Sequence, residues 1–250
     1  MTFTGRVAVI TGGGSGIGRA TAFEMARRGA AVAVMDLDAQ AAARVVDELQ
    51  GASGLSLGLD VSDPEAVERA MTEAAARLGR LDYLVNCAGV APRVDEGRTA
   101  EVPVASWRRV IDINLSGSFF AAKHAIPFML KGGGGVVINL SSLMGQVSTV
   151  NTAAYTASKH AIVGLTKTIA LEYARDGIRA IAIGPGVIET PMTAGPISDA
   201  NIGAALLSAI PLGRFGRPEE VARMIVAMCS DDASYVTGSF VPVDGGYLAQ

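Results

Sequence analysis

Short apolar runs alternate with longer alanine-rich segments along almost the whole chain. The apolar runs are rich in β-branched residues. Their hydrophobic positions are nearly continuous, as in RVAVIT at residues 6–11 and AVAVMD at residues 31–36. Strands of this kind are buried on both faces, which is typical of a parallel sheet covered by helices on each side. The alternation therefore predicts an α/β fold with a doubly wound parallel sheet of about seven strands and helices on both faces.

The boundaries of these segments follow from their periodicity and from the residues at their ends. The predicted strands cover residues 6–11, 31–36, 55–60, 81–86, 135–142, 178–186 and 239–244. The predicted helices cover residues 17–29, 38–50, 62–79, 103–130, 152–175 and 217–229. Gly29 and Gly79 are expected to end their helices, and Pro127 is expected to kink or end the helix 103–130.

One segment, residues 187–215, departs from the alternation, because it holds three prolines, three glycines and no clear strand. It follows the carboxyl end of a predicted strand, where ligands bind in sheets of this kind. We interpret it as a mobile lid over a substrate, with a plain surface loop as the alternative. No linker or repeat divides the sequence, so residues 1–250 are expected to form a single domain.

The composition limits the partners that this chain can have. Of its residues, 18% are charged and the net charge is −3, which gives no electrostatic case for binding nucleic acid or an anionic membrane. The low charged fraction fits a chain that hides surface in an oligomer. Cys87 and Cys229 form neither a disulfide framework nor a metal-binding pattern, so we expect reduced thiols, a cytoplasmic location and no metal. The first residues do not resemble a signal peptide, and no apolar run reaches about 18 residues.

A glycine-rich stretch, TGGGSGIGRA at residues 11–20, stands between the first predicted strand and the first predicted helix. Such a loop directs backbone N–H groups and a helix N-terminus towards a diphosphate. Gly12 permits the tight turn, Gly16 lets the backbone approach the phosphate, and Gly18 lets the helix pack on the sheet. These glycines, with Ser15 and Ile17, are predicted to bind a dinucleotide cofactor.

The second predicted strand ends at Asp36, where a carboxylate can accept hydrogen bonds from both ribose hydroxyls of an adenosine. A carboxylate would also repel a 2′-phosphate, so Asp36 favours NAD over NADP. The alternative is that Asp36 caps the following helix, a position for which Asp38 competes. Arg19 could contact a phosphate, but Asp36 is expected to dominate the choice of cofactor.

Further cofactor contacts are expected where other strands end. The carboxylate of Asp60 follows the third strand and could reach the adenine amino group. The sequence NCAG at residues 86–89 ends the fourth strand with small residues that let the backbone pass close to the cofactor. The contacts expected after the second, third and fourth strands are Leu37, Asp60, Val61, Asn86, Ala88 and Gly89.

Taken together, these features resemble the short-chain dehydrogenase/reductase family over essentially the whole chain. The resemblance is carried by TGGGSGIG at residues 11–18, NCAG at 86–89, Asn114 in DINLSGSF, Ser142 in INLSS, YTASK at 155–159, GPGVIETPM at 184–192 and VDGGY at 243–247. It implies a single-domain Rossmann fold, NAD as the cofactor and an Asn-Ser-Tyr-Lys tetrad. Two positions depart from the family pattern, since Cys87 stands where Asn is common and Gly184 stands where a larger residue precedes Pro-Gly.

In the YTASK motif, Tyr155 and Lys159 lie about 6 Å apart along a helix and on one face of it. A phenol has a pKa of about 10, and a nearby ammonium favours the phenolate and lowers that pKa. The resemblance implies that Tyr155 is the general acid/base and that Lys159 lowers its pKa and binds the nicotinamide ribose. It also implies that Ser142 holds the substrate oxygen, with Ser141 as the alternative, and that Asn114 binds a water that extends the proton relay.

The resemblance also assigns the segment after the sixth predicted strand. The backbone of Ile188 and the hydroxyl of Thr190 are expected to hold the nicotinamide carboxamide, with Pro185 and Gly186 beside the cofactor. Contacts with the substrate are expected at Met144, Gln146, Val147 and Met192.

The leading prediction is an NAD-dependent oxidoreductase that interconverts a secondary alcohol and a ketone by hydride transfer. Residues 191–212 are largely apolar, so the substrate is expected to be small and mostly uncharged. The alternative is a 3-oxoacyl-(acyl-carrier-protein) reductase that uses NADPH, and a third hypothesis is a non-catalytic dinucleotide-binding scaffold. The helices 103–130 and 152–175, with the apolar C-terminal segment, favour a homotetramer, as in many members of the family.

Overall fold

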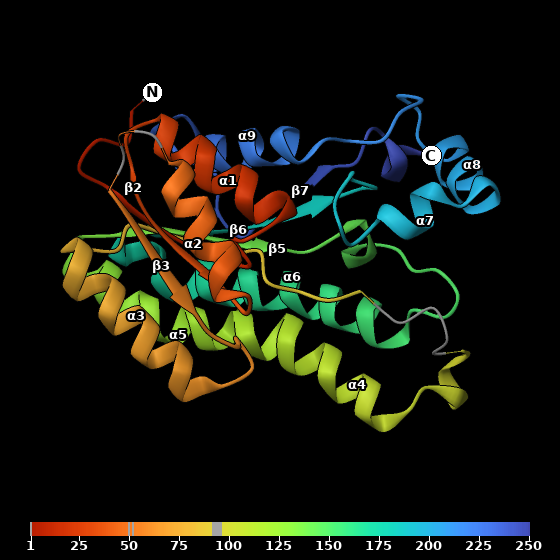
Figure 1. Cartoon of the computed structure of the whole chain (residues 1–250), viewed down its shortest axis with the longest axis horizontal. Coiled ribbons are helices and arrows are strands. Elements are labelled where there is room, and N and C mark those ends of the chain that lie inside the picture. The colour runs from red at the N-terminus through yellow and green to blue at the C-terminus, as the bar shows by residue number, and fades with distance from the viewer. Residues whose placement is uncertain (1, 50, 52, 92–96) are drawn as a thin grey trace.

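The predicted strands form one parallel sheet in the part of the chain that the structure describes (Figure 1). The computed structural model describes residues 2–49, 51, 53–91 and 97–250. The strands are β1 (Val7–Thr11), β2 (Ala31–Asp36), β3 (Gly54–Gly58), β4 (Tyr83–Asn86), β5 (Gly135–Leu140), β6 (Ile178–Pro185) and β7 (Phe240–Val243). Their order is β3-β2-β1-β4-β5-β6-β7, so the direction in which strands are added reverses between β1 and β4.

Helices cover both faces of the sheet, which confirms the predicted fold class (Figure 1). They are α1 (Gly16–Arg27), α2 (Ala39–Glu48), α3 (Pro64–Leu78), α4 (Val104–Ile111), α5 (Gly117–Lys131), α6 (Ala153–Tyr173), α7 (Ala194–Ser198), α8 (Ala200–Ser208) and α9 (Pro218–Cys229). Helices α1, α2 and α9 pack on one face, and α3, α5 and α6 pack on the other.

Each face of the sheet has its own hydrophobic core, because successive strand residues point to opposite faces. In β1, Val7 and Val9 pack towards α3, α5 and α6. Ala8 and Ile10 pack towards α1, α2 and α9. All of these side chains are buried, as the continuous apolar pattern of the strand predicts.

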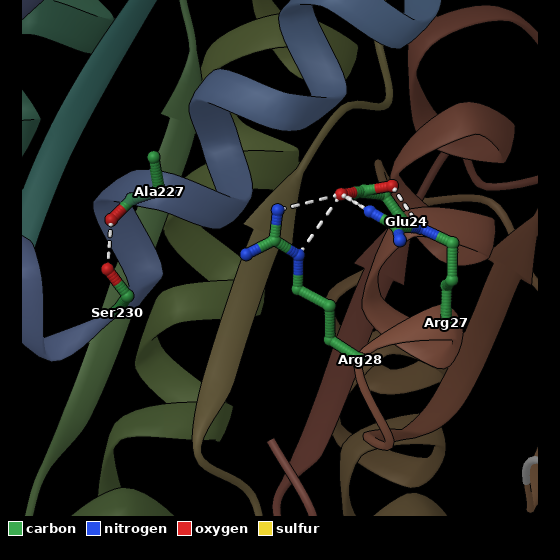
Figure 2. Close-up of polar contacts among 5 residues, drawn as sticks. All are labelled: Glu24, Arg27, Arg28, Ala227 and Ser230. Atoms are coloured by element: carbon green, nitrogen blue, oxygen red, sulfur yellow. Dashed lines mark hydrogen bonds and ion pairs between the residues drawn. The ribbon is translucent and has the colours of Figure 1, made fainter. Parts of the chain in front are cut away.

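Helices α1 and α9 lie side by side on one face of the sheet. At the end of α1, Glu24 accepts hydrogen bonds of 2.8–3.1 Å from Arg27 and Arg28 (Figure 2). The bond from Arg27 is the main reason why the pKa of Glu24 is below its usual range. At the end of α9, Ser230 Oγ donates to the carbonyl of Ala227 at 2.7 Å. These bonds fix the ends of a helix pair whose first member begins at the glycine-rich loop.

The ends of α3 illustrate how the sequence sets helix boundaries. Asp63 caps the helix by accepting the N–H groups of Glu65 and Ala66, both at 3.0 Å. Pro64 is the first helical residue, where its missing N–H costs nothing. Gly79 ends the helix in the left-handed region, with φ of +85°, as predicted.

The predicted helix 103–130 is divided by a π-helical turn, Asp112–Ser116, between α4 and α5. Such turns are frequent at functional sites. The expectation that Pro127 ends the helix is wrong, because α5 continues to Lys131 and stops at Gly132. A change in helix geometry occurs earlier, at the turn that contains Asn114, and a kink at Pro127 stays a prediction.

The segment 187–215 contains the short helices α7 and α8, which the sequence analysis did not predict, and its role as a lid stays a prediction. Asp199 caps α8 by accepting the N–H groups of Asn201 at 3.0 Å and Ile202 at 2.9 Å. The surrounding prolines and glycines obscure this cap in the sequence. At the base of the segment, Ile188 forms a parallel bridge with Gly216. The two helices lie at one end of the molecule, beyond the sheet (Figure 1).

Candidate active site

A cavity of about 330 Å³ opens where the strand order reverses between β1 and β4. Ligands bind at this place in open α/β sheets. Its wall includes most of the predicted cofactor contacts: Gly12, Ser15, Gly16, Ile17, Gly18, Asp36, Leu37, Asp60, Val61, Ala88, Gly89, Tyr155, Lys159, Pro185, Gly186, Ile188 and Thr190. Ser142 and Met192 also line it. The other predicted site residues, which the structure also describes, lie outside the wall: Asn86, Asn114, Met144, Gln146 and Val147.

The glycine-rich loop needs glycine at two positions for reasons of space. A Cβ atom on Gly18 would lie 2.1 Å from the carbonyl oxygen of Gly12, because α1 packs tightly on the turn. Gly12 has a φ of +63°, and a Cβ atom there would lie 2.7 Å from the backbone of Ala88 after β4. This close packing turns the N-terminal residues of α1 towards the cavity, where Gly16 and Ile17 line the wall.

Asp36 faces the cavity and also holds the loop. Its Oδ2 accepts the N–H of Gly14 at 2.8 Å, and its Oδ1 accepts the N–H of Asp38 at 3.0 Å. Asp38 is the residue that caps α2, so the alternative role for Asp36 is wrong. Each carboxylate oxygen of Asp36 retains a lone pair for a further donor.

Arg19 is held away from the cavity by an ion pair. Its Nη2 lies 2.6 Å from Oε2 of Glu48 at the end of α2. Its guanidinium also lies over the ring of Phe23, 4.6 Å from the ring centroid. Arg19 is therefore already paired and does not line the wall where a 2′-phosphate would need a cation.

The two serines after β5 have different surroundings, although both line the cavity. Ser141 Oγ donates to the carbonyl of Lys159 at 2.9 Å, and a Cβ atom on Gly145 would lie 2.3 Å from that Oγ. Ser142 Oγ accepts one backbone N–H at 3.2 Å and lies near enough to Tyr155 to lower the pKa of the phenol. Ser142 is thus the hydroxyl that stands beside Tyr155.

Tyr155 and Lys159 lie on α6, and Lys159 Nζ is 5.6 Å from the centroid of the Tyr155 ring. Lys159 is 6% exposed, and its Nζ donates to the carbonyl of Leu140 at 2.8 Å. Burial lowers the pKa of Lys159 to about 8. Burial raises the pKa of Tyr155, and the Ser142 hydroxyl offsets part of this rise. The net shift of the Tyr155 pKa is upward because desolvation is its largest cause, and a lowering of this pKa by Lys159 stays a prediction.

Asn114 lies in the π-helical turn and is almost completely buried. Its Oδ1 accepts the N–H of Val90 at 2.8 Å, and its Nδ2 donates to the carbonyl of Val90 at 3.1 Å. Nδ2 also lies 3.2 Å from Ser158 Oγ, which donates to the carbonyl of Tyr155 at 2.7 Å. The side chain of Asn114 therefore links the cavity wall after β4 to the helix that carries Tyr155.

Asn86 does not line the cavity, and its side chain is engaged elsewhere, so a cofactor contact by its backbone stays a prediction. Its Nδ2 donates to Oδ1 of Asn139 at 2.9 Å and contacts the carbonyl of Ser118 at 3.3 Å. Asn139 in turn donates to Thr166 at 2.9 Å. Asn86 is the last residue of β4, and its side chain points into the layer between the sheet and α6 instead of into the cavity.

Several residues of the wall were not predicted as contacts: Leu59, Cys87, Val90, Ile113, Leu140, Pro191 and Thr193. Most of them adjoin a predicted contact, so their position just after a strand could have indicated that they line the cavity. Burial raises the pKa of the Cys87 thiol to about 12, so the residue that replaces the usual Asn is a neutral thiol. Ile113 lacked any such signal, because the π-helical turn places it in the wall.

The four predicted substrate contacts divide between two places. Met192 lines the cavity and is 47% exposed. Met144, Gln146 and Val147 follow Ser142, and the last two are exposed. Contact between these three residues and a substrate stays a prediction.

Among residues 2–49, 51, 53–91 and 97–250, no three His, Cys, Asp or Glu side chains gather as they would around a metal ion. Over the same residues, no helix is both long enough and apolar enough to cross a membrane.

The chain is similar to known proteins over almost its whole length. Residues 12–248 match a family model described as enoyl-(acyl carrier protein) reductase. The chain is 43% identical over 249 residues to cis-4-hydroxycyclohexanecarboxylate dehydrogenase from Sinomonas cyclohexanicum, covering 99% of this chain and 98% of that protein. It is 40% identical over 250 residues to cyclohexanol dehydrogenase from Acinetobacter sp. strain SE19, covering 99% and 97% of the two proteins.

Two further likenesses bear on the fold and on the alternative function. A short-chain type dehydrogenase/reductase from Mycobacterium ulcerans has a solved structure that matches with a TM-score of 0.96 at 32% identity, covering 100% of this chain and 92% of that chain. A 3-oxoacyl-(acyl-carrier-protein) reductase from Thermotoga maritima is 39% identical over 250 residues, covering 99% of this chain and all of that protein. Each of the two matches covers at least 99% of this chain, which includes the strands and helices that line the cavity.

Proposed function

Because the chain belongs to the short-chain dehydrogenase/reductase family, we propose that it uses NAD to interconvert a secondary alcohol and a ketone by hydride transfer. It is an oxidoreductase that acts on alcohol or ketone groups, and its family binds a nicotinamide dinucleotide. The observation that carries the proposal is a shared cavity. Ser142, Tyr155 and Lys159 line the same cavity as the glycine-rich loop and Asp36.

The residues of the cavity fit a dinucleotide. The tight packing of Gly12 and Gly18 leaves the N-terminus of α1 beside the cavity, where its N–H groups can bind a diphosphate. Asp36 has lone pairs left for the ribose hydroxyls, and its charge would repel a 2′-phosphate. Arg19 is paired with Glu48 and does not offset that charge. These observations support NAD over NADP.

Tyr155 is proposed to move the proton of the reaction. NAD, when bound, supplies the acceptor for the hydride of the carbinol carbon. In alcohol oxidation the Tyr155 oxygen takes the hydroxyl proton, and in ketone reduction it returns the proton to the carbonyl oxygen. Ser142 Oγ holds the same substrate oxygen and stabilises the negative charge that develops on it.

Lys159 and Asn114 are proposed to support the proton transfer. Lys159 would bind the hydroxyls of the nicotinamide ribose, and its positive charge favours the phenolate form of Tyr155. The side chain of Asn114 is committed to Val90 and Ser158. A role for Asn114 in binding a relay water therefore falls to its backbone carbonyl, which accepts a bond of 2.9 Å from Ser118 Oγ and has a second lone pair.

The wall near Tyr155 supports a small and mostly uncharged substrate. Val90, Ile113 and Met192 give it an apolar lining. Within the described residues, Lys159 is the cation of this wall, so a substrate carboxylate would find no second positive partner there. Two relatives that are 40% and 43% identical to this chain are named for the alcohols they oxidise, cyclohexanol and cis-4-hydroxycyclohexanecarboxylate. We therefore propose a cyclic secondary alcohol without a charged group as the substrate class.

The experiment that tests this function measures NAD reduction by absorbance with a panel of secondary alcohols, including cyclohexanol, in parallel with NADP. We expect turnover with NAD and at least tenfold lower kcat/KM with NADP. The Tyr155→Phe variant should bind NADH like the original chain and lose turnover. Unchanged turnover in this variant would remove Tyr155 as the proton donor, and binding without any turnover in the original chain would favour a scaffold.

A 3-oxoacyl-(acyl-carrier-protein) reductase is the second candidate, favoured by the Thermotoga maritima relative. Reduction of a carrier-bound ketone would need basic residues that dock an acidic carrier. Near the helix ends that precede β5 and β6, the candidates are Lys131 and Arg175. A strong preference for NADPH in reduction of an acetoacetyl thioester would favour this function and contradict the proposal above.

We also propose that the chain forms a homotetramer, with residues 187–215 as a lid. Apolar side chains are exposed on the helices that would meet between subunits, namely Val104, Trp107, Phe119 and Leu171. Burial of such side chains stabilises subunit contacts. Light scattering should give four times the mass of the chain, and a monomer at micromolar concentration would contradict the proposal.

A further inference from the structure

After β6, backbone hydrogen bonds hold the chain up to Glu189, and side-chain hydrogen bonds hold the turn that follows. Up to Glu189 the backbone is bonded like a strand to Gly216. The N–H of Glu189 donates to the Gly216 carbonyl at 2.9 Å, and the N–H of Gly216 donates to the Val187 carbonyl at 3.0 Å. In the described structure, the following turn is held mainly through one side chain, that of Thr193.

The hydroxyl of Thr193 uses its full bonding capacity on this turn. It accepts the N–H of Thr190 at 3.1 Å and lies 3.1 Å from Thr190 Oγ1. It donates to the carbonyl of Ile188, with the Thr190 carbonyl at 3.2 Å as the other acceptor within reach. A hydroxyl has one hydrogen and two lone pairs, so each is engaged. The N–H of Thr193 also donates to the Thr190 carbonyl at 3.1 Å and closes the turn.

The bonds of Thr193 determine part of the cavity wall. Ile188, Thr190 and Thr193 all line the cavity. A Cβ atom on Gly16 would lie 3.3 Å from Cγ2 of Thr190, so Thr190 and the glycine-rich loop approach each other at the rim. Loss of the Thr193 hydroxyl would free the backbone and the hydroxyl of Thr190, because a backbone N–H and a carbonyl would both lose their partner.

On its other side, Thr193 adjoins the helices of the lid. The N–H of Ile197 donates to the Thr193 carbonyl at 3.0 Å, where α7 begins. Helix α7 packs mainly against α8, and most residues of both helices are exposed. The bonds of the Thr193 hydroxyl all run towards β6 and none to α7 or α8 in the described structure. The hydroxyl of Thr193 therefore supports the turn from the β6 side, and the backbone carbonyl of the same residue joins the turn to α7.

We propose that Thr193 is a positioning residue that fixes Ile188 and Thr190 for the nicotinamide end of the cofactor. This inference rests on the proposed function, because the two residues act in this way only if a dinucleotide binds in the cavity. Thr193 itself acts through them, and the property it controls is the face of the nicotinamide that is presented to the substrate.

Three variants isolate the hydroxyl of Thr193. Thr193→Val keeps the shape of the side chain without the hydroxyl, and Thr193→Ser keeps the hydroxyl. Ser198→Ala is the matched control, because Ser198 Oγ donates to the Gly195 carbonyl at 2.9 Å inside α7 and lies outside the cavity wall. NADH affinity is measured by fluorescence titration without substrate. We expect a Kd about tenfold higher for Thr193→Val and within about twofold of the original for the other two.

The second measurement follows deuterium from the carbinol carbon of a substrate alcohol into the reduced cofactor. The original chain and Thr193→Ser should place deuterium on one face of the nicotinamide, and Thr193→Val should place a measurable fraction on both. A merely structural role would lower the melting temperature without mixing the faces. If Thr193→Val does not fold, Thr193→Ala carries the same expectation.

The outcomes distinguish a failure of the proposed function from a failure of the proposed role of Thr193. An original chain that does not bind NADH would overturn the proposed function. An original chain that binds NADH, together with a Thr193→Val variant of equal affinity and one-sided transfer, would overturn only the role of Thr193. Equal loss in Thr193→Ser and Thr193→Val would also overturn it, because the hydroxyl would then not be the group that matters.

Discussion

Lys159 is a buried cation in the wall of the cavity, and its burial lowers the stability of the folded chain. Its pKa falls from the ordinary value of 10.5 to about 8, because burial disfavours the charged form. A fall of this size corresponds to about 3 kcal/mol against folding when the side chain is protonated. Among the described residues, its Nζ donates one hydrogen bond, to the Leu140 carbonyl, which offsets about 1 kcal/mol of this. A residue that weakens the fold in this way is typical of a functional site.

The cost of Lys159 should depend on pH in a defined direction. Below pH 8 the side chain is protonated in the folded and unfolded states, so the folded chain bears the full cost. Between pH 8 and 10.5 the folded chain loses the proton first, and stability rises with pH. Lys159→Met should therefore melt about 5 °C above the original chain at pH 7, with the difference shrinking towards pH 10. Thermal unfolding followed by circular dichroism tests this.

Lys167→Met is the control for that experiment, since Lys167 is exposed on the same helix. Its melting temperature should stay within about 1 °C of the original at every pH. A constant difference between Lys159→Met and the original chain across the pH range would contradict the argument, because the effect would then come from packing and not from charge.

Asp36 combines two roles that substitution can separate. Asp36→Asn removes the charge and retains one of the two oxygen acceptors, so we expect kcat/KM with NADP to rise at least tenfold and the melting temperature to fall less than in Asp36→Ala. Asp36→Ala leaves the N–H groups of Gly14 and Asp38 without their acceptor. It should lower the melting temperature and raise the KM for NAD about tenfold or more.

Asp38→Asn is the matched control for Asp36→Asn, because it removes the same charge two residues away and outside the cavity wall. It should leave the NAD to NADP ratio of kcat/KM within about twofold. An equal change of this ratio in Asp36→Asn and Asp38→Asn would show a general effect of net charge and would contradict a direct role of Asp36.

At the scale of elements, the boundaries of the strands and of most helices could be predicted to within two residues. They follow from local features, namely continuous apolar runs and end residues such as Asp63 and Gly79. The π-helical turn Asp112–Ser116 was not predicted, and its residue Asn114 pairs with Val90 in another part of the chain, a contact that no local pattern reveals. The burial of Asn86 was missed for the same reason, since its partner Asn139 lies on the neighbouring strand.

Gly184 stands where a larger residue is common in the family, and the packing of β6 against β7 explains why this chain has glycine there. A Cβ atom on Gly184 would lie 2.1 Å from Cζ of Phe240, whose ring occupies the space of a larger side chain. Gly184→Ala should therefore lower the melting temperature by about 5 °C through overpacking. The double variant Gly184→Ala/Phe240→Val should lose less than the sum of the single variants, with a coupling of about 1 kcal/mol.

The control for Gly184→Ala is Gly195→Ala, since a Cβ atom on Gly195 meets no atom within 4 Å. It should leave the melting temperature unchanged or slightly higher. Additive losses in the double variant would mean that Phe240 is not the reason for glycine at position 184.

At the scale of the whole molecule, the cavity joins the two halves of the sheet. The glycine-rich loop and Asp36 come from the half that contains β1, β2 and β3, whereas Ser142, Tyr155 and Ile188 come from the half that begins at β4. The convergence of distant segments was predictable because all strands are parallel, so their carboxyl ends meet at one edge. The wall residues outside the sequence motifs, such as Leu59 and Ile113, depend on how the strand ends pack together. The hydrophobic pattern of the sequence carries little information on that packing.

A ligand that contacts both halves should stabilise the whole fold. NADH at about 100 times its Kd should add about 2.7 kcal/mol to the free energy of unfolding, which corresponds to a rise in melting temperature of about 5–10 °C. NADPH at the same concentration should give a clearly smaller rise, because the charge of Asp36 opposes the 2′-phosphate. Tyr155→Phe separates binding from chemistry, since it should show the full rise with NADH and no turnover. An equal rise with NADPH would contradict the NAD preference, and no rise with either cofactor would mean that the cavity does not bind a dinucleotide.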